Sequence, residues 1–160
     1  MSGDPLALAR ALGGSSPRQT FVLIPLLTAA SELLPRRRPR VRGEWLALCI
    51  AGYALYRGAG AYRQAERAGP PGFERAPDRL VTTGPYAWSR NPMYLGHLVF
   101  LAGLALATGS PVAVGGLLWQ WRRLGHRVRV DEERLERIFG DEYRDYVRRV
   151  PRWLPLPAEG

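Results

Sequence analysis

The sequence predicts an all-α fold: an integral membrane helical bundle of about four membrane helices, followed by a cytoplasmic helical C-terminal segment. Three observations predict this fold. The apolar residues gather into four blocks with arginines between them, one uncharged run covers 29 residues from Met93 to Trp121, and the segment after this run has helical spacing. At 160 residues, the chain has room for a single domain.

The first two apolar blocks lie in the N-terminal half. The first, from Thr20 to Leu34, is interrupted by Pro25 and Glu32. It is short for a membrane span, which needs about 20 residues, and we interpret it as a retained anchor that is shallow or re-entrant. The second runs from Glu44 to Tyr62. If this block spans, the arginine-rich segment 36–42 falls outside, against the positive-inside rule, so the sidedness of this half stays open.

The third and fourth blocks form one run from Met93 to Trp121. A single helix of this length would reach about 43 Å, which is more than a hydrocarbon core of about 30 Å requires. Gly109, Ser110 and Pro111 lie just past the middle of the run and are typical of a turn. We therefore expect a helical hairpin.

Folding the chain about Gly109 and Ser110 has a geometric consequence. It places Met93 level with His126, and it brings residues 88–90 level with residues 129–131. The loop from Gly84 to Pro92 should then meet the acidic residues 131–133 at one membrane face, although the two segments are far apart in the chain.

After the hairpin, residues 131–149 are polar with apolar residues at helical spacing, namely Leu135, Ile138, Phe139, Tyr143, Tyr146 and Val147. Gly140 is the expected break between two helices. This stripe either packs as a surface helix pair against the core or forms part of a site. In the tail that follows, Trp153 can anchor at the membrane interface.

The loop before the hairpin and the start of the first hairpin arm hold the densest set of candidate site residues. In the loop these are Gly84, Pro85, Tyr86, Arg90, Asn91 and Pro92, and on the arm they are Tyr94 and His97. Taken separately, Gly, Asn and Pro are ordinary turn residues, and a lone His97 is more often an interior histidine than a catalyst. Polar residues inside a membrane segment nevertheless favour a functional hypothesis.

The acidic residues Asp131, Glu132 and Glu133 also have two readings. They fit the first turn of a helix, where the helix dipole favours negative charge. In the hairpin they instead lie opposite an arginine and two tyrosines. Such a site suits a ligand with a cationic centre, hydroxyls and a carboxylate, because tyrosine faces attract cations and Arg90 or turn amides receive carboxylates.

The composition weighs against other functions. The net charge is +9 and all 23 basic residues are arginine, which fits nucleic acid or an anionic membrane face. A nucleic-acid binder does not explain the uncharged run, so we expect no nucleic-acid partner. The sequence contains no nucleophile elbow and no P-loop. His97, His126 and the single Cys49 do not form a metal site, and we expect none.

Two stretches together resemble a known family. They are L-V-T-T-G-P-Y-A-W-S-R-N-P-M-Y-L-G, and, after the hairpin, D-E-E-R-L-E-R-I-F-G-D-E-Y-R-D-Y-V-R-R-V-P-R-W-L-P. They are similar to the isoprenylcysteine carboxyl methyltransferase family, and the resemblance is to its bacterial-type members. Phospholipid methyltransferases share the same core pattern. The resemblance covers residues 79 to 155.

The resemblance implies an integral membrane enzyme that uses S-adenosylmethionine. It places the cofactor-binding core in residues 79–155 and the N-terminal membrane helices with a linker in 1–78. It implies cofactor contacts by Gly84, Pro85, Tyr86, Arg90, Asn91, Pro92, Tyr94, His97, Asp131 and Glu132, of which Arg90, Tyr94 and Glu132 are the catalytic candidates. Two positions depart from the family: Asn91 stands for a frequent histidine, and Asp131 for the first glutamate of a pair.

The expected function is methyl transfer to a lipophilic acceptor, through a carboxylate or an amine, at the cytoplasmic face of the membrane. The acceptor would be a small molecule or a lipid-modified molecule, reached among membrane lipids. The alternative is a non-enzymatic membrane scaffold or accessory protein that keeps the family core as packing.

Overall fold

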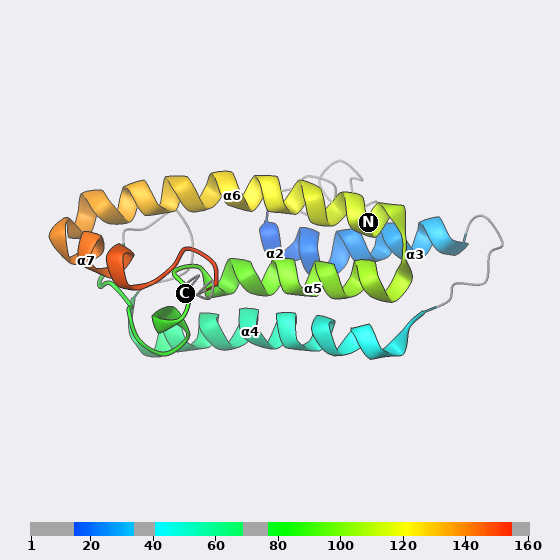
Figure 1. Ribbon diagram of the computed structural model, residues 1–160, viewed down its shortest axis with the longest axis horizontal. Helices are drawn as coiled ribbons and strands as arrows, with labels where there is room; N and C mark the ends of the chain where they lie inside the picture. Colours follow the sequence, from blue (N-terminus) through cyan, green and yellow to red (C-terminus); the bar gives the residue numbers. More distant parts are fainter. Residues whose placement is uncertain (1–14, 34–40, 69–76, 155–160) are drawn as a thin grey trace, which may run out of the picture. The chain divides into compact units, whose positions relative to one another are not determined.

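The computed structural model describes residues 15–33, 41–68 and 77–154, and within these ranges its regular structure is entirely helical (Figure 1). The predicted all-α class is confirmed. The elements in chain order are α2 (Ser16–Arg18), the π-helical η1 (Gln19–Leu23), α3 (Ile24–Leu33), the 3₁₀ turn η2 (Gly43–Trp45), α4 (Leu46–Ala65), the 3₁₀ turn η3 (Gly84–Ala87), α5 (Pro92–Thr108), α6 (Pro111–Phe139) and α7 (Asp141–Arg149).

Among the described residues, no helix combines the length and the apolar character that crossing a bilayer requires. The expected number of membrane helices stays a prediction.

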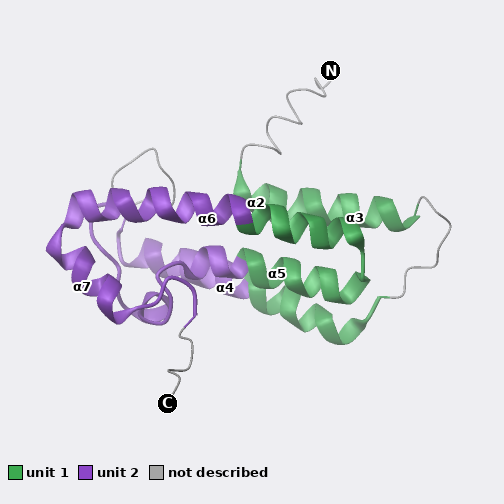
Figure 2. Ribbon diagram, turned by 45° about the horizontal axis from the view of Figure 1, so that its top comes forward, with its two compact units in different colours: residues 1–53, 97–121 green, residues 54–96, 122–160 purple. Residues whose placement is uncertain are grey.

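The chain divides into two compact units, which Figure 2 shows in different colours. Unit 1 consists of residues 1–53 and 97–121, and unit 2 consists of residues 54–96 and 122–160. Helices α4, α5 and α6 contribute residues to both units.

Unit 1 contains a cluster of aromatic rings around Phe21. The ring of Phe21 meets Tyr53 and Phe100 edge-on, with ring centroids 5.2 and 4.9 Å apart. The π-helical turn Gln19–Leu23 ends two residues before Pro25. Because proline lacks an N–H and its ring clashes with the carbonyl four residues earlier, a locally wider turn accommodates it.

The predicted hairpin turn is confirmed within unit 1. α5 ends at Thr108 and α6 begins at Pro111. Gly109 has a φ of +63°, in the left-handed region that glycine adopts without a Cβ penalty. Pro111 then opens α6, where its missing N–H costs no helical hydrogen bond.

Unit 2 contains the predicted break at Gly140, which has a φ of +51° and separates α6 from α7. One of the two alternatives for the acidic residues is wrong. Asp131 does not open a helix, because α6 runs unbroken from Pro111 to Phe139. Between Trp121 and Phe139 only Gly125 weakens the helix, and a single glycine is tolerated in a helix interior. The helix-dipole reading of Asp131 and its neighbours therefore fails.

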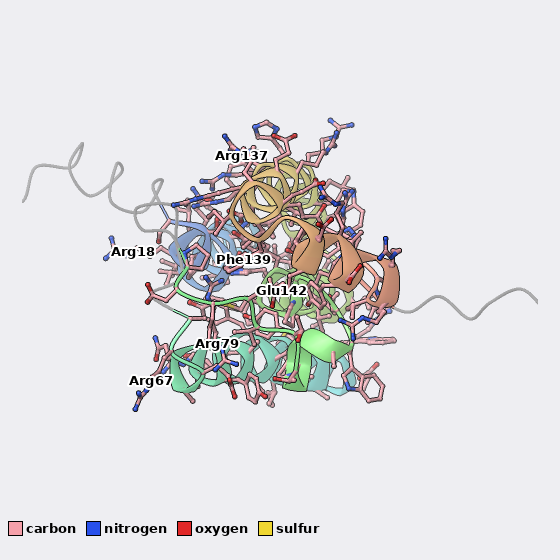
Figure 3. The ribbon with its side chains drawn as sticks, turned by 90° about the vertical axis from the view of Figure 1, so that its left-hand side faces the viewer. Arg18, Arg67, Arg79, Arg137, Phe139 and Glu142 are labelled. Atoms are coloured by element: carbon pink, nitrogen blue, oxygen red, sulfur yellow. The ribbon has the colours of Figure 1, made fainter. Side chains whose placement is uncertain are left out.

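The apolar stripe of residues 135–147 is only partly buried. Tyr143, Tyr146 and Val150 form a buried cluster against which Leu80, Leu135 and Phe139 pack. Ile138 and Val147 are exposed. The outer surface of unit 2 carries arginines, and Figure 3 shows the side chains of Arg67 and Arg137 reaching outward from the ribbon.

Candidate functional site

The first turn of the site loop is fixed by Gly84 in unit 2. Its φ is +58°, and a Cβ at this position would lie 2.5 Å from the ring of Tyr62. A residue with a side chain would therefore meet both backbone strain and a steric clash. The turn η3 follows, with Pro85 in its first positions, and the buried Tyr146 donates a hydrogen bond of 2.6 Å to the carbonyl of Tyr86.

The second turn is held by the C-terminal segment. The backbone N–H of Arg90 donates to the carbonyl of Pro151 at 3.0 Å. The Asn91 side-chain amide donates to the carbonyl of Arg152 at 3.1 Å, while the backbone N–H of Asn91 donates to Ser89 Oγ. Pro92 then begins α5. The Asn91 side chain thus has a structural partner in this chain.

Tyr94, on α5, donates a hydrogen bond of 2.8 Å to Asp131 on α6. The predicted meeting of the Gly84-to-Pro92 loop with the acidic residues is confirmed beside this contact, by the ion pair of Arg90 with Glu132. Burial raises the pKa of the Asp131 carboxyl above its usual value, although the Tyr94 hydrogen bond and the nearby charges of Arg127, Arg63 and Arg134 work to lower it.

Glu132 lies between two arginines. Arg90 Nη1 is 3.2 Å from Glu132 Oε1, and Arg152 Nη2 is 2.7 Å from Glu132 Oε2. The side chains of Arg90 and Glu132 are 10% and 12% exposed, whereas that of Arg152 is 44% exposed. Beside them, burial raises the pKa of Tyr143 to about 12; the Glu132 charge adds to this shift and Arg90 opposes it.

His97 is placed in unit 1. Its side chain is buried and its ring stacks on Phe21, with centroids 4.9 Å apart. The structure thus gives His97 an interior packing contact, and its cofactor contact stays a prediction. Glu133, the third acidic residue, is exposed, so the acidic pair of the site is Asp131 and Glu132.

Three arginines of unit 2 were not among the predicted site residues. Arg63 and Arg127 act electrostatically on both Tyr94 and Asp131, and Arg152 pairs with Glu132. Arg127 could have been found, because it precedes Asp131 by four residues on one helix face. No local sequence pattern marks Arg63 or Arg152 as a site residue. Arg63 lies on α4 and Arg152 follows α7, whereas Tyr94 and the acidic pair lie on α5 and α6.

This arrangement offers complementary chemistry at close quarters. The Asp131 carboxylate can accept hydrogen bonds from hydroxyls or ammonium groups, and the arginines can bind carboxylate or phosphate oxygens. Both oxygens of Glu132 are already engaged by arginine. A ligand that uses Glu132 must therefore share it or displace an arginine.

About half of the chain is similar in sequence to known methyltransferases. The chain is similar to protein-S-isoprenylcysteine O-methyltransferase of Mus musculus, with 40% identity over 78 residues that cover 48% of this chain and 28% of the mouse protein. The protein of the same name from Saccharomyces cerevisiae is 35% identical over 78 residues, covering 48% and 33%. The match thus spans about a third or less of these relatives.

A solved structure of the eukaryotic intramembrane Ras methyltransferase ICMT (isoprenylcysteine carboxyl methyltransferase) has the same fold. It aligns with a TM-score of 0.61 and 24% identity, over 98% of this chain and 54% of that one. The profile of the family described as phospholipid methyltransferase matches residues 46–142, which is more than half of the chain and includes both the loop and the acidic pair. The chain belongs to the phospholipid methyltransferase family.

Proposed function

We propose that this protein transfers a methyl group from S-adenosylmethionine to a lipophilic acceptor. The observation that carries the proposal is the contact between the loop and the acidic pair, Tyr94 with Asp131 and Arg90 with Glu132. Family membership supports methyl transfer as the reaction, and the resemblance of the loop and acidic segments to the family pattern supports this place as the cofactor site.

The side chains at this place fit the cofactor by their chemistry. S-adenosylmethionine carries a sulfonium cation, an ammonium group, a carboxylate and ribose hydroxyls. Asp131 and Glu132 would accept from the hydroxyls or the ammonium, Arg90 would receive the carboxylate, and the face of Tyr94 would attract the cation. The Tyr86 ring packs in the buried cluster with Ala59, Ala68 and Val81, so Tyr86 would contribute through its backbone. The backbone of the Gly84-to-Pro92 turns, with Pro85 and Asn91, would line the adjoining surface.

The bound cofactor supplies a methyl group on a positively charged sulfur, which leaves as a neutral thioether when an oxygen or nitrogen attacks the methyl carbon. The chain then needs mostly to position the reactants and exclude water. Tyr94, fixed by its bond to Asp131, would hold the cation in place. Arg90 and Glu132 would orient the charged groups on either side.

The exposed side chains support a membrane setting. Unit 1 exposes many large apolar residues, and in a membrane lipid tails would cover them. They include Val22, Leu26, Leu27, Leu33, Ile50, Leu118, Trp119 and Trp121. Unit 2 exposes arginines that can bind anionic headgroups. We place the protein in a membrane, the inner membrane if it is bacterial, with its site on the cytoplasmic side.

The acceptor would then be a lipophilic small molecule or a lipid-modified molecule that arrives among membrane lipids. The named relatives are isoprenylcysteine O-methyltransferases, so for this chain we propose a carboxylate or amine acceptor with an apolar tail.

The test is a calorimetric titration of S-adenosylmethionine into the purified full chain in detergent. We expect saturable binding, and weaker binding to Glu132→Gln and Tyr94→Ala. Lipid extract incubated with methyl-labelled cofactor should then yield a labelled lipophilic product in mass spectrometry. A flat titration with folded wild-type protein would refute the proposal.

The second candidate function is a non-enzymatic scaffold or accessory protein. The double engagement of Glu132 by Arg90 and Arg152 favours it, because the same contacts would serve packing alone. In that case Glu132→Gln lowers the unfolding temperature while wild-type protein shows no cofactor binding.

A further inference from the structure

The segment 150–153, which we call the C-terminal strap, follows α7 and lies against the loop that precedes α5 within unit 2 (Figure 1). Three hydrogen bonds fasten it there. Pro151 O accepts from the backbone of Arg90, and Arg152 O accepts from Ser89 Oγ at 3.3 Å and from the Asn91 side chain at 3.1 Å. All three use carbonyls of the strap, so these bonds can persist when the Arg152 side chain moves.

The side chain of Arg152 makes a separate contact. Its Nε lies 3.2 and 3.1 Å from the two oxygens of Glu132, and its Nη2 donates to Oε2 at 2.7 Å. Glu132 also pairs with Arg90. Two guanidinium groups therefore share one carboxylate, which leaves one positive charge in surplus.

The two arginines differ in how easily they can leave. The Arg90 side chain is 10% exposed, so moving it away from Glu132 would leave a buried charge without its counter-ion. The Arg152 side chain is 44% exposed and can turn into water, and such exposed ion pairs contribute little. Arg152 is the partner that Glu132 can exchange.

We propose that Arg152 is a displaceable counter-ion that competes with the cofactor for Glu132. The inference rests on the proposed function, because it takes the ammonium or ribose hydroxyls of S-adenosylmethionine as the groups that engage this carboxylate. In the free protein Arg152 covers Glu132. On binding, its side chain swings out while the strap stays fastened by its carbonyls, and the Arg90–Glu132 pair remains.

Competition and a packing role predict opposite changes in cofactor affinity when Arg152 is replaced. Removing the Arg152 charge spares the cofactor the work of displacing it, so affinity rises. From the strength of exposed ion pairs, we expect Kd to fall about two- to fivefold. If Arg152 instead served to hold Glu132 in place, its removal would weaken binding.

The experiment compares the full chain with Arg152→Gln, Arg152→Lys and the control Arg149→Gln, by calorimetry with S-adenosylmethionine in detergent. Arg149 is also exposed, but its guanidinium contacts the Asp145 carbonyl on α7. We expect tighter binding only for Arg152→Gln, with Arg152→Lys and Arg149→Gln close to wild type. Thermal unfolding should show a lower midpoint for ligand-free Arg152→Gln and a larger rise on adding the cofactor.

The outcomes separate the two proposals. Equal or weaker binding by folded Arg152→Gln, with binding intact in wild type, overturns the competition alone. Tightening by Arg149→Gln to the same extent also overturns it, because the effect would then be one of general charge. Absence of binding to both wild type and Arg152→Gln overturns the proposed function and the competition together.

Discussion

Tyr94 and Asp131 are 37 residues apart in the chain and are joined by a hydrogen bond of 2.8 Å from the phenol to the carboxylate. The bond links the first turn of α5 to the C-terminal half of α6. The hairpin register predicted that residues 88–90, not Tyr94, would lie level with Asp131. The Tyr94–Asp131 bond defines one side of the proposed cofactor site.

Replacing Tyr94 with Phe tests this bond. The ring stays in place, but Asp131 loses a donor while partly buried, so we expect a loss of roughly 1–2 kcal/mol in unfolding free energy. Cofactor affinity should fall as well, because Asp131 is no longer oriented. The control is Tyr62→Phe, which removes a hydroxyl from the exposed pair with Thr83 and should cost less than about 0.5 kcal/mol. Equal losses in denaturant titrations of the two variants would contradict the prediction.

The raised pKa of Asp131 predicts a dependence on pH. Because burial holds its pKa above the usual value of 3.8, the folded protein binds this proton more tightly than the unfolded chain does. The protonated Asp131 carboxyl therefore stabilises the folded protein. This stabilisation is complete below pH 3.8 and is lost as the pH rises through the folded-state pKa. Asp131→Asn lacks this titration and keeps an oxygen that can accept from Tyr94.

Unfolding free energies of wild type and Asp131→Asn should therefore diverge as the pH rises from about 3.8, in favour of the variant, and then stay a constant distance apart. Denaturant titrations between pH 3.5 and about 7 check this. A difference that does not change with pH, or one that grows in favour of wild type, would show that Asp131 does not have a raised pKa.

Much of this site was predictable because one hairpin determines it. Gly109, Ser110 and Pro111 mark the turn, and counting outward from them pairs the loop with Asp131. Gly140 likewise predicted the break between α6 and α7. These features depend on backbone chemistry that single residues impose locally.

The remaining contacts depend on packing between elements, which has no local signal. Arg152 reaches Glu132 only because α7 folds back and its tail lies against the loop. The reading of residues 131–133 as a helix start was wrong because the arginines after Trp121 look like the end of an apolar segment, whereas a helix backbone is indifferent to that change of polarity. The π-helical turn before Pro25 depends in the same way on its surroundings.

Gly84 should tolerate no side chain. Gly84→Ala places a Cβ at positive φ and against the Tyr62 ring, so we expect a loss of roughly 1–3 kcal/mol. Gly58→Ala is the matched control. Nothing lies within 4 Å of a Cβ there, and alanine favours a helix interior by about 0.5–1 kcal/mol. Thermal unfolding should show a lower midpoint for the first variant and an unchanged or higher one for the second.

Tyr146→Phe should destabilise the Gly84-to-Ala87 turn. The buried Tyr146 hydroxyl donates to the Tyr86 carbonyl at 2.6 Å, and without it that carbonyl is left short of a partner. We expect a loss of about 1–2 kcal/mol in unfolding free energy. Hydrogen exchange should also be faster at the amides of Tyr86 and Trp88, which donate within this turn. Unchanged exchange at both amides would show that the turn does not depend on this bond.

Glu132 and Glu133 are adjacent but should respond differently to the loss of charge. Glu132→Gln leaves the nearly buried guanidinium of Arg90 without its counter-ion, so we expect a loss of about 1–3 kcal/mol in stability and a marked loss of cofactor affinity. Glu133 is exposed, and Glu133→Gln should change stability by less than about 0.5 kcal/mol and leave affinity unaltered. Denaturant titration and calorimetry on both variants check this. Equal effects would mean that overall negative charge on α6, rather than the Arg90–Glu132 pair, determines binding.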